Sequence, residues 1–501
     1  MPSIKLNSLS NLVRFIINIA IGLLLTPFII NSLGKNGYGV WVLIGSFVGY
    51  YGLLNLGLDA AIRRYISIYT AQNKSNDLNK VASTALVMFS CTGLTVMTLS
   101  VVFSGDIADF FNVSPADHKD FTQLVEIMGI TIGLGFPAGV FSAIVTAREH
   151  FIAINIMGIV NQIIRSILTV LFLINGFGLV GLGMATLIGV IFLLGANFFI
   201  FKWYANDIKL KVTNFSRPTL RIMLAFGVSA FIISVGDILR LQIDSFIIGK
   251  YVSLEMVGVY GLAMLLVRYL ISGVVSVMGT VAPRFAFLHG DDNQVALRSL
   301  FFKSLSASAI VSSLFTFLLL LCADAFIRLW VGDGFKSATA VIWILSLSYL
   351  FDLVQNPSIS LMYAKNKHHI YALLTISEGV LNLLLSLALV SDHGIIGVAL
   401  GTALSTIVVR IIIQPIIVSK LAEISLFKYV GTMLPAFLVF FTLLAFLIYF
   451  NQEINSLLYS YVNLVIACLF SSVIYIFGVM MFSRQLRESM VSFFSSRRRL
   501  L

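Results

Sequence analysis

Long apolar stretches alternate with short polar ones along the whole chain. Fourteen windows of about 20 residues are apolar enough to cross a bilayer as α-helices. These windows are residues 9–31, 39–61, 81–103, 122–146, 152–174, 178–202, 221–247, 256–282, 303–323, 338–363, 369–390, 394–418, 427–450 and 456–482. The pattern predicts an all-α polytopic membrane protein with fourteen transmembrane helices.

The composition supports this prediction. Of 501 residues, 59% are hydrophobic and only 11% are charged, so a soluble fold would leave far too much apolar surface in water. The net charge of +11 suggests nucleic acid, but the basic residues lie in short loops between apolar windows, where membrane topology explains them. We therefore expect membrane lipids, and no nucleic acid, among the partners.

The distribution of positive charge predicts the orientation. When both termini are placed in the cytoplasm, most of the 33 Lys and Arg residues fall in cytoplasmic loops and tails. The outside loops contain only Lys35, Lys119, Lys250, Arg328 and Lys336. The first window contains Arg14 and has no small-residue cleavage site before Gly34, so we expect a transmembrane helix there and not a signal peptide.

A repeat divides the chain into two halves. The segment GLVGLGMAT opens window 178–202, and the similar segment GIIGVALGT opens window 394–418. Two pseudo-symmetric lobes of six helices each would then share one orientation, because an even number of helices separates the repeats. The predicted parts are an N-lobe (1–203), a cytoplasmic linker (204–220), a C-lobe (221–420), two C-terminal helices (421–482) and a basic amphipathic cytoplasmic tail (483–501).

Arginines inside the apolar windows are the first candidates for a site. An arginine at the centre of a bilayer costs about 2.5–3.5 kcal/mol on insertion scales, so it needs a reason to be there. The substrate-binding candidates are Arg14, Arg165, Arg268, Arg240 and Arg410. They predict a positively charged, hydrated cavity between the lobes, whose guanidinium groups bind the oxygens of an anionic substrate.

Polar residues at helical spacing accompany these arginines. The cavity candidates of this kind are Asn18, Asn155, Gln162 and Asn382. Two alternatives stay open. Arg240 lies within helical pairing distance of Asp237 and Asp244, and these three charges would then neutralise one another. Arg14 and Arg410 lie toward the inner ends of their windows and would then reach lipid headgroups.

Acidic residues inside the windows are candidates for ion coupling. Glu378 lies in the middle of window 369–390 among hydroxyl and amide side chains, so burial would make its neutral form accessible. Asp352 and Asp237 are the next candidates. A structural hydrogen bond is the alternative role for Glu378.

Four residues are candidates for a gate or hinge. Asp59 and Arg63 are spaced for an ion pair at the cytoplasmic end of the second window. Pro137 and Pro357 each remove one backbone hydrogen bond inside a window and permit a bend, although many static helices are also kinked.

No enzyme signature is present. The sequence contains no Walker loop, no nucleophile elbow and no HExxH segment. Its three cysteines, Cys91, Cys322 and Cys468, lack the spacings that bind zinc or an iron–sulfur cluster. We expect a transporter without a metal or cofactor.

Three segments carry a resemblance to a known family. They are the opening hairpin LGKNGYGVW with GLLNLGLDAAIRRY behind it, the segment IIGKYVSLEMVGVYG, and the GLVGLGMAT and GIIGVALGT repeat. The chain resembles the polysaccharide flippases of the multidrug, oligosaccharidyl-lipid and polysaccharide exporter superfamily. These flippases handle O-antigen or capsule repeat units.

This resemblance implies a function. Such proteins move undecaprenyl-pyrophosphate-linked oligosaccharides from the cytoplasmic to the periplasmic leaflet of the bacterial inner membrane by alternating access, coupled to an H+ or Na+ gradient. It also implies polysaccharide polymerase machinery as a partner. Related lipid II flippases have cavity arginines in the first and eighth helices, where this chain has Arg14 and Arg268.

Three alternatives remain. A lipid II flippase, or a flippase for another lipid-linked glycan, would share most of these features. A drug/cation antiporter would need an acidic cavity, which the five arginines argue against. A polysaccharide polymerase or ligase would need a long outside loop with catalytic arginine or histidine, whereas residues 104–121 carry mainly acids and one lysine.

Overall fold

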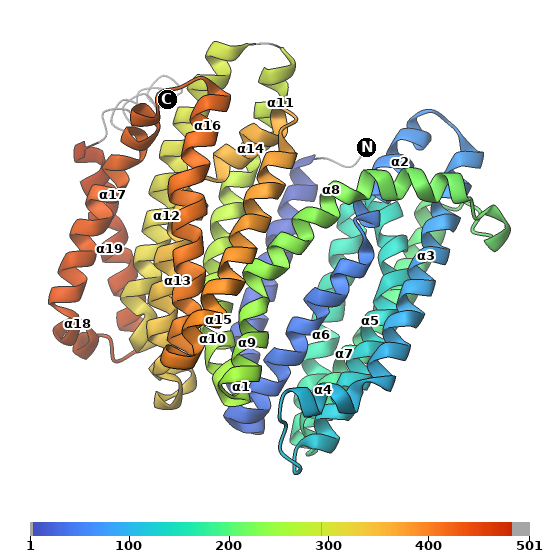
Figure 1. The fold of residues 1–501 in the computed structure, drawn as a ribbon, viewed down its shortest axis with the longest axis horizontal. Helices are drawn as coiled ribbons and strands as arrows, with labels where there is room; N and C mark the ends of the chain where they lie inside the picture. Colours follow the sequence, from blue (N-terminus) through green and yellow to red (C-terminus); the bar gives the residue numbers. More distant parts are fainter. Residues whose placement is uncertain (1–3, 292, 483–501) are drawn as a thin grey trace, which may run out of the picture. The chain divides into compact units, whose positions relative to one another are not determined.

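The computed structural model describes residues 4–291 and 293–482, and these residues form helices without any β-strand (Figure 1). The chain contacts itself as two compact units, which we call unit 1 (Met1–Gly258) and unit 2 (Val259–Leu501). The predicted lobes are instead divided by the linker at residues 204–220, and that repeat-based division stays a prediction. The predicted amphipathic tail, 483–501, lies outside the described residues.

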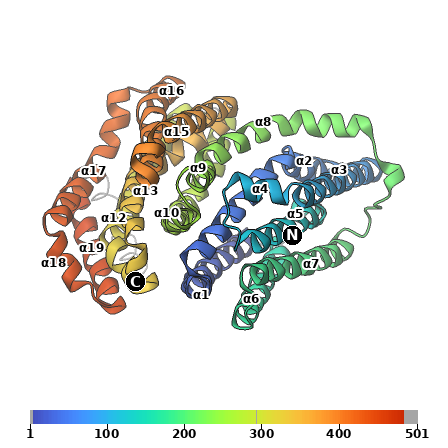
Figure 2. The same ribbon diagram turned by 60° about the horizontal axis from the view of Figure 1, so that its bottom comes forward.

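Unit 1 is built from nine α-helices and two short 3-10 turns in its described part. Their bounds are α1 (Ile4–Gly52), η1 (Leu53–Asn55), α2 (Leu58–Ala71), α3 (Ser75–Val102), α4 (Ser104–Phe110), α5 (His118–Ala147), α6 (Phe151–Ile174), α7 (Gly178–Tyr204), η2 (Val212–Asn214), α8 (Arg217–Leu241) and α9 (Ile243–Tyr251). Helix α5 packs against both α3 and α7, and all three run side by side in Figures 1 and 2.

Glycines permit the closest approaches in unit 1. Gly34 adopts φ 70°, a conformation that side chains disfavour, and it breaks α1 into two helical arms. A methyl group on Gly39 would lie 1.7 Å from the carbonyl oxygen of Leu254, so the second arm can touch the start of the next helix only through a glycine. A methyl group on Gly93 would likewise lie 2.3 Å from the carbonyl oxygen of Gly133, which fixes the α3–α5 crossing.

Helix α10 (Leu254–Met278) runs across the division between the units, and unit 2 contains the helices that follow. Their bounds are η3 (Gly279–Val281), α11 (Ala282–Gly290), α12 (Gln294–Val331), η4 (Asp333–Phe335), α13 (Ser337–Val354), α14 (Asn356–Ala364), α15 (His368–Thr406), the π-helix η5 (Ile407–Ile413), α16 (Gln414–Ala422), α17 (Leu426–Tyr449), α18 (Asn451–Leu457) and α19 (Tyr461–Phe482). Helix α12 packs against α13, α17 and α19, which surround it in both views.

The apolar helices confirm a multi-pass membrane protein. Eleven of the described helical segments are long and apolar enough to cross a bilayer, or twelve if the bent pair Arg217–Val228 and Ala230–Leu241 is one span. Two of these segments, Ser10–Asn55 and His368–Ala422, have 46 and 55 residues, whereas one crossing needs about 20. Each contains a non-helical glycine, Gly34 or Gly394. The predicted count of fourteen is not confirmed by this search.

Candidate functional site

Arg410 carries a completely buried charge in unit 2. This residue lies in the π-helix η5, which joins α15 to α16, and its side chain is completely buried. π-helical turns are rare and are frequently found at functional sites. The side chain therefore does not reach lipid headgroups, and the alternative that Arg410 extends to the membrane surface is wrong.

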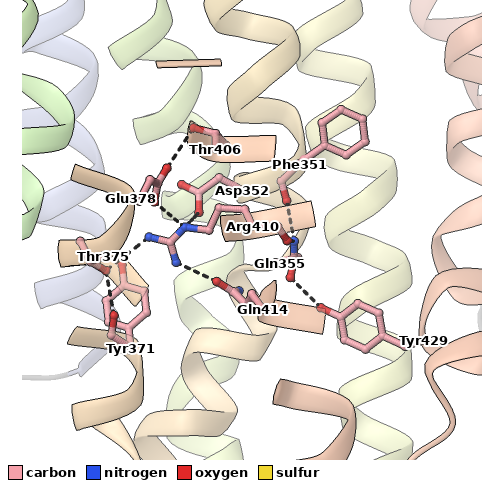
Figure 3. A network of polar contacts seen from close by, with 10 residues as sticks. All are labelled: Phe351, Asp352, Gln355, Tyr371, Thr375, Glu378, Thr406, Arg410, Gln414 and Tyr429. Atoms are coloured by element: carbon pink, nitrogen blue, oxygen red, sulfur yellow. Dashed lines mark hydrogen bonds and ion pairs between the residues drawn. The ribbon is translucent and has the colours of Figure 1, made fainter. Parts of the chain in front are cut away.

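Side chains from three neighbouring segments surround the Arg410 guanidinium (Figure 3). Its Nε donates to Glu378 Oε2 at 2.7 Å and lies 3.3 Å from Asp352 Oδ1. Its two terminal nitrogens donate to Gln414 Oε1 at 2.7 Å and to Thr375 Oγ1 at 3.3 Å. We call these five residues the Arg410 cluster. One guanidinium faces two carboxylates, so its positive charge is compensated within unit 2.

A second layer holds the cluster in place. Thr406 donates to Glu378 Oε1 at 2.9 Å, so both oxygens of this carboxylate are hydrogen-bonded. The backbone carbonyl of Arg410 accepts from Gln355, whose own side-chain oxygen accepts from the Tyr429 hydroxyl at 3.1 Å. The ring of Tyr371 lies 5.3 Å from the guanidinium carbon, within the range of a cation–π contact.

Asn382 connects the two arms of α15. Its Oδ1 accepts from Ser386 at 3.0 Å and from Thr402 at 3.1 Å, and all three side chains are buried. Ser386 precedes the break at Gly394, and Thr402 follows it. A methyl group on Gly401 would lie 2.4 Å from Ser386 Oγ, so the arms meet closely here. This contact brings Glu378 and Arg410 onto facing surfaces.

In unit 1, Arg14 belongs to a network of amides and hydroxyls. Its guanidinium donates to Asn155 Oδ1 at 3.2 Å, and Asn155 donates in turn to Ser10 Oγ at 2.9 Å and Asn11 Oδ1 at 2.6 Å. These contacts join α1 to α6. A methyl group on Gly158 would lie 2.7 Å from the Arg14 guanidinium carbon, so this glycine makes room for the arginine.

The arginine of α6, Arg165, is also bonded to an amide. Arg165 is partly buried and donates to Gln162 Oε1 at 2.8 Å, one turn earlier on the same helix. Among the described residues, neither Arg14 nor Arg165 forms an ion pair with a carboxylate. Their charges are therefore not compensated in the way that the charge of Arg410 is. Asn18, predicted to share this polar surface, is exposed on α1.

The other candidate charges have different surroundings. Arg240 and Asp244 are 7% and 2% exposed, and Asp237 is partly buried. Asp237 and Arg240 lie on α8, and Asp244 lies on α9 just beyond Gln242, so the mutual neutralisation of these three charges stays a prediction. Arg268 is exposed on α10.

The gate and hinge candidates lie in or beside helices of both units. Asp59 and Arg63 form a 3.9 Å ion pair on α2, with both side chains partly exposed. Pro357 begins α14 directly after the helix is interrupted at Gln355, whereas Pro137 lies inside α5 without ending it. Their roles as a gate and as hinges stay predictions.

A family model described as "polysaccharide biosynthesis protein" matches residues 33–340, which is more than half of the chain. The chain belongs to this family. The resemblance to polysaccharide flippases of the multidrug, oligosaccharidyl-lipid and polysaccharide exporter superfamily is thereby confirmed.

Two related proteins match this chain along most of its length. A putative O-antigen transporter of Shigella flexneri is 24% identical over 82% of this chain and 97% of its own. An uncharacterised membrane protein, EpsK of Bacillus subtilis, is 23% identical over 83% of each chain.

Solved structures of transporters share the fold. The lipid II flippase MurJ in an inward closed conformation has a TM-score of 0.69 at 15% identity, and the match covers 94% of this chain and 99% of that one. An inward-facing multidrug transporter of the MATE family has a TM-score of 0.68 at 15% identity, covering 82% of this chain and 96% of that one.

The structure brings two sets of the predicted site residues into contact. Glu378, Asp352 and Arg410 meet in one cluster, and Arg14 meets Asn155. The sequence reasoning missed the partners Gln414 and Thr406. Gln414 follows Arg410 by one helical turn, so helical spacing in the sequence could have predicted this contact. Thr406 is far from Glu378 in the sequence, and the two meet only because the chain folds back.

One ion pair outside the apolar spans was also missed. Arg148, at the end of α5, donates to both carboxylate oxygens of Asp207, at 2.6 and 2.7 Å. These hydrogen bonds hold the pKa of the Asp207 carboxyl below its ordinary value. The pair connects the ends of α5 and α7 within unit 1.

Proposed function

We propose that this protein flips undecaprenyl-pyrophosphate-linked oligosaccharide repeat units from the cytoplasmic to the periplasmic leaflet of the bacterial inner membrane. The observation that carries the proposal is the family match over residues 33–340, together with a Shigella relative named as a putative O-antigen transporter and covered almost completely. The fold shared with solved transporters supports a transport function over an enzymatic one.

The proposed topology has fourteen spans with both termini in the cytoplasm. Eleven or twelve apolar segments are found, and the two long ones are each broken by a glycine at a point where the chain can turn back. Counting the bent pair as one span and each of the two long segments as two spans gives fourteen. Two six-helix lobes and two C-terminal helices fit this count.

The proposed substrate cations are Arg14 and Arg165, and Arg268 remains in the set because the family resemblance implies a cavity arginine in its helix. A pyrophosphate needs positively charged donors that are not already bound to carboxylates, and the hydrogen bonds found for Arg14 and Arg165 go to amide oxygens. Arg240 and Arg410 remain in the proposed substrate set, but the two carboxylates beside Arg410 make it a weak anion ligand.

The Arg410 cluster is the proposed coupling element. Glu378 and Asp352 compete for one guanidinium, so adding a proton or a sodium ion to either carboxylate would change how strongly Arg410 is held. The π-helix that carries Arg410 gives the backbone an alternative hydrogen-bonding register. Asp237 in unit 1 remains a third proposed coupling residue, and H+ and Na+ are both candidate ions.

A lipid II flippase is the second candidate function. It is favoured by one observation, the match of 94% of this chain to the fold of such a flippase at a TM-score of 0.69. Both candidate substrates are lipid-linked glycans. The sugar composition of the accumulated intermediate decides between them.

The test is the leaflet position of the lipid-linked oligosaccharide in cells depleted of this protein. Spheroplasts are treated with an external glycosidase or lectin, and the cells are complemented with wild type, Arg165→Gln or the matched control Arg217→Gln at an exposed position. We expect the intermediate to accumulate in a shielded position without complementation and with Arg165→Gln, but not with the control. Accumulation on the outer face would refute flipping and would favour a polymerase or ligase.

A further inference from the structure

A positively charged groove lies in unit 2, apart from the Arg410 cluster. It has a volume of about 720 Å³ and runs between the first turns of α12 and α17. The charged residues that line it are Arg298 and Lys303 on α12, Glu423 before α17, and Lys428 on α17. None of the residues that line the groove belongs to the cluster.

The charges of the groove leave a surplus of two positive charges. Arg298 donates to Glu423 and to the carbonyl oxygen of Ala422 at 3.2 Å, so this pair is neutral and fixes the wall of the groove. Lys303 and Lys428 are both exposed, and neither forms an ion pair within residues 4–291 and 293–482. Both ammonium groups remain available to an anion.

Hydroxyl and apolar side chains alternate in the rest of the lining. Ser299, Ser306 and Ser425 offer hydroxyl groups, and Phe302 and Pro435 offer apolar surface. The Lys428 ammonium lies 4.6 Å from the Phe302 ring centre, so the cation and the apolar wall are adjacent. A ligand that fits this lining has a phosphate-like head and an apolar body.

We propose that this groove binds the headgroup phosphate of an anionic membrane phospholipid. Two lysines attract the phosphate, the hydroxyls donate to its oxygens, and the apolar wall meets the acyl chains. The predicted topology places this end of α12 at the cytoplasmic leaflet, where anionic lipids provide the ligand.

The test uses the full-length protein in mixed micelles and titrates phosphatidylglycerol or phosphatidylcholine while bound lipid is counted by native mass spectrometry. Lys303→Gln/Lys428→Gln should weaken phosphatidylglycerol binding about 30-fold, which corresponds to about 2 kcal/mol for two cations. The matched control, Lys209→Gln/Lys211→Gln, removes the same charge from exposed positions of unit 1 and should bind as wild type does.

Four results would overturn the proposal. One is an equal loss of bound phosphatidylglycerol in the control variant, which would indicate general attraction to the protein's net charge. Another is equal occupancy of the protein by phosphatidylcholine. The third is displacement of bound phosphatidylglycerol by inorganic phosphate alone at matched concentration, which would assign the groove to a free anion. A photoreactive phosphatidylglycerol on wild-type protein provides a readout that does not depend on any variant folding, and labels away from α12 and α17 would also refute the site.

Discussion

Replacing Arg410 by glutamine tests the buried cluster directly, because its guanidinium forms ion pairs with two carboxylates. The change removes hydrogen bonds to Glu378, Gln414 and Thr375 and leaves negative charge inside unit 2. Removing one partner of a buried ion pair costs about 3–5 kcal/mol. Arg298→Gln makes the same substitution in an exposed ion pair, where about 0–1 kcal/mol is expected.

The assay is equilibrium unfolding in mixed micelles, in which the fraction of denaturing detergent is raised and helix loss is followed. Glu378→Gln should cost about 1–3 kcal/mol, because the amide keeps one acceptor and Arg410 keeps Asp352. The double variant Arg410→Gln/Glu378→Gln should cost about 2 kcal/mol less than the sum of the two, because the two residues interact directly.

Two outcomes would refute this reasoning. The first is unfolding of Arg410→Gln at the same detergent fraction as Arg298→Gln, which would mean that the cluster contributes nothing to stability. Alternatively, the single costs add up in the double variant, in which case Arg410 and Glu378 do not interact in the folded protein.

Three further predictions follow from single contacts. Mild oxidation should form a disulfide between Cys322 and Cys468, because their sulfur atoms lie 3.3 Å apart on α12 and α19. Mass spectrometry should then show a loss of two hydrogens, and Cys322→Ser should abolish that loss. Gly39→Val should prevent folding, because the added carbons overlap the start of α10, whereas Gly45→Val on the same helix meets open space and should yield monodisperse protein on size exclusion. Because the pKa of Asp207 is lowered from 3.8, its ion pair stabilises the fold above that pH and is lost as the pH falls through the lower folded value; Asp207→Asn should therefore flatten acid unfolding curves.

Hydropathy alone predicted the main helices, because a bilayer crossing needs about 20 apolar residues whatever their neighbours are. Window 152–174 corresponds to α6 (Phe151–Ile174), and window 427–450 to α17 (Leu426–Tyr449). The positions where helices break were harder to predict from the sequence. The division between α8 and α9 at Gln242 leaves no trace in hydropathy, because it depends on backbone angles within a continuous apolar stretch.

Three members of the Arg410 cluster, Arg410, Glu378 and Asp352, were predicted as site residues, but their association was not. Helical spacing identified Glu378 and Asp352 on polar faces, since a period of 3.6 residues gives the face of each helix. Which faces meet is decided by packing between helices. Glu378 and Arg410 are 32 residues apart, and they meet because α15 turns at Gly394.

Arg165, a proposed substrate ligand, and Arg410, in the proposed coupling cluster, have different hydrogen-bond partners. Their glutamine variants should therefore differ in their effects on stability and transport. Arg165 is bonded to an amide, so replacing it leaves no carboxylate uncompensated, and Arg165→Gln should unfold within about 1 kcal/mol of wild type. Its transport should nevertheless fail, because an anionic substrate loses a charged donor. Arg410→Gln should instead lose stability first, because two carboxylates lose their cation. Unfolding and spheroplast accessibility measured on both variants test this separation, and a strongly destabilised Arg165→Gln or a fully stable Arg410→Gln would show that the assignment of substrate binding and coupling to these residues is wrong.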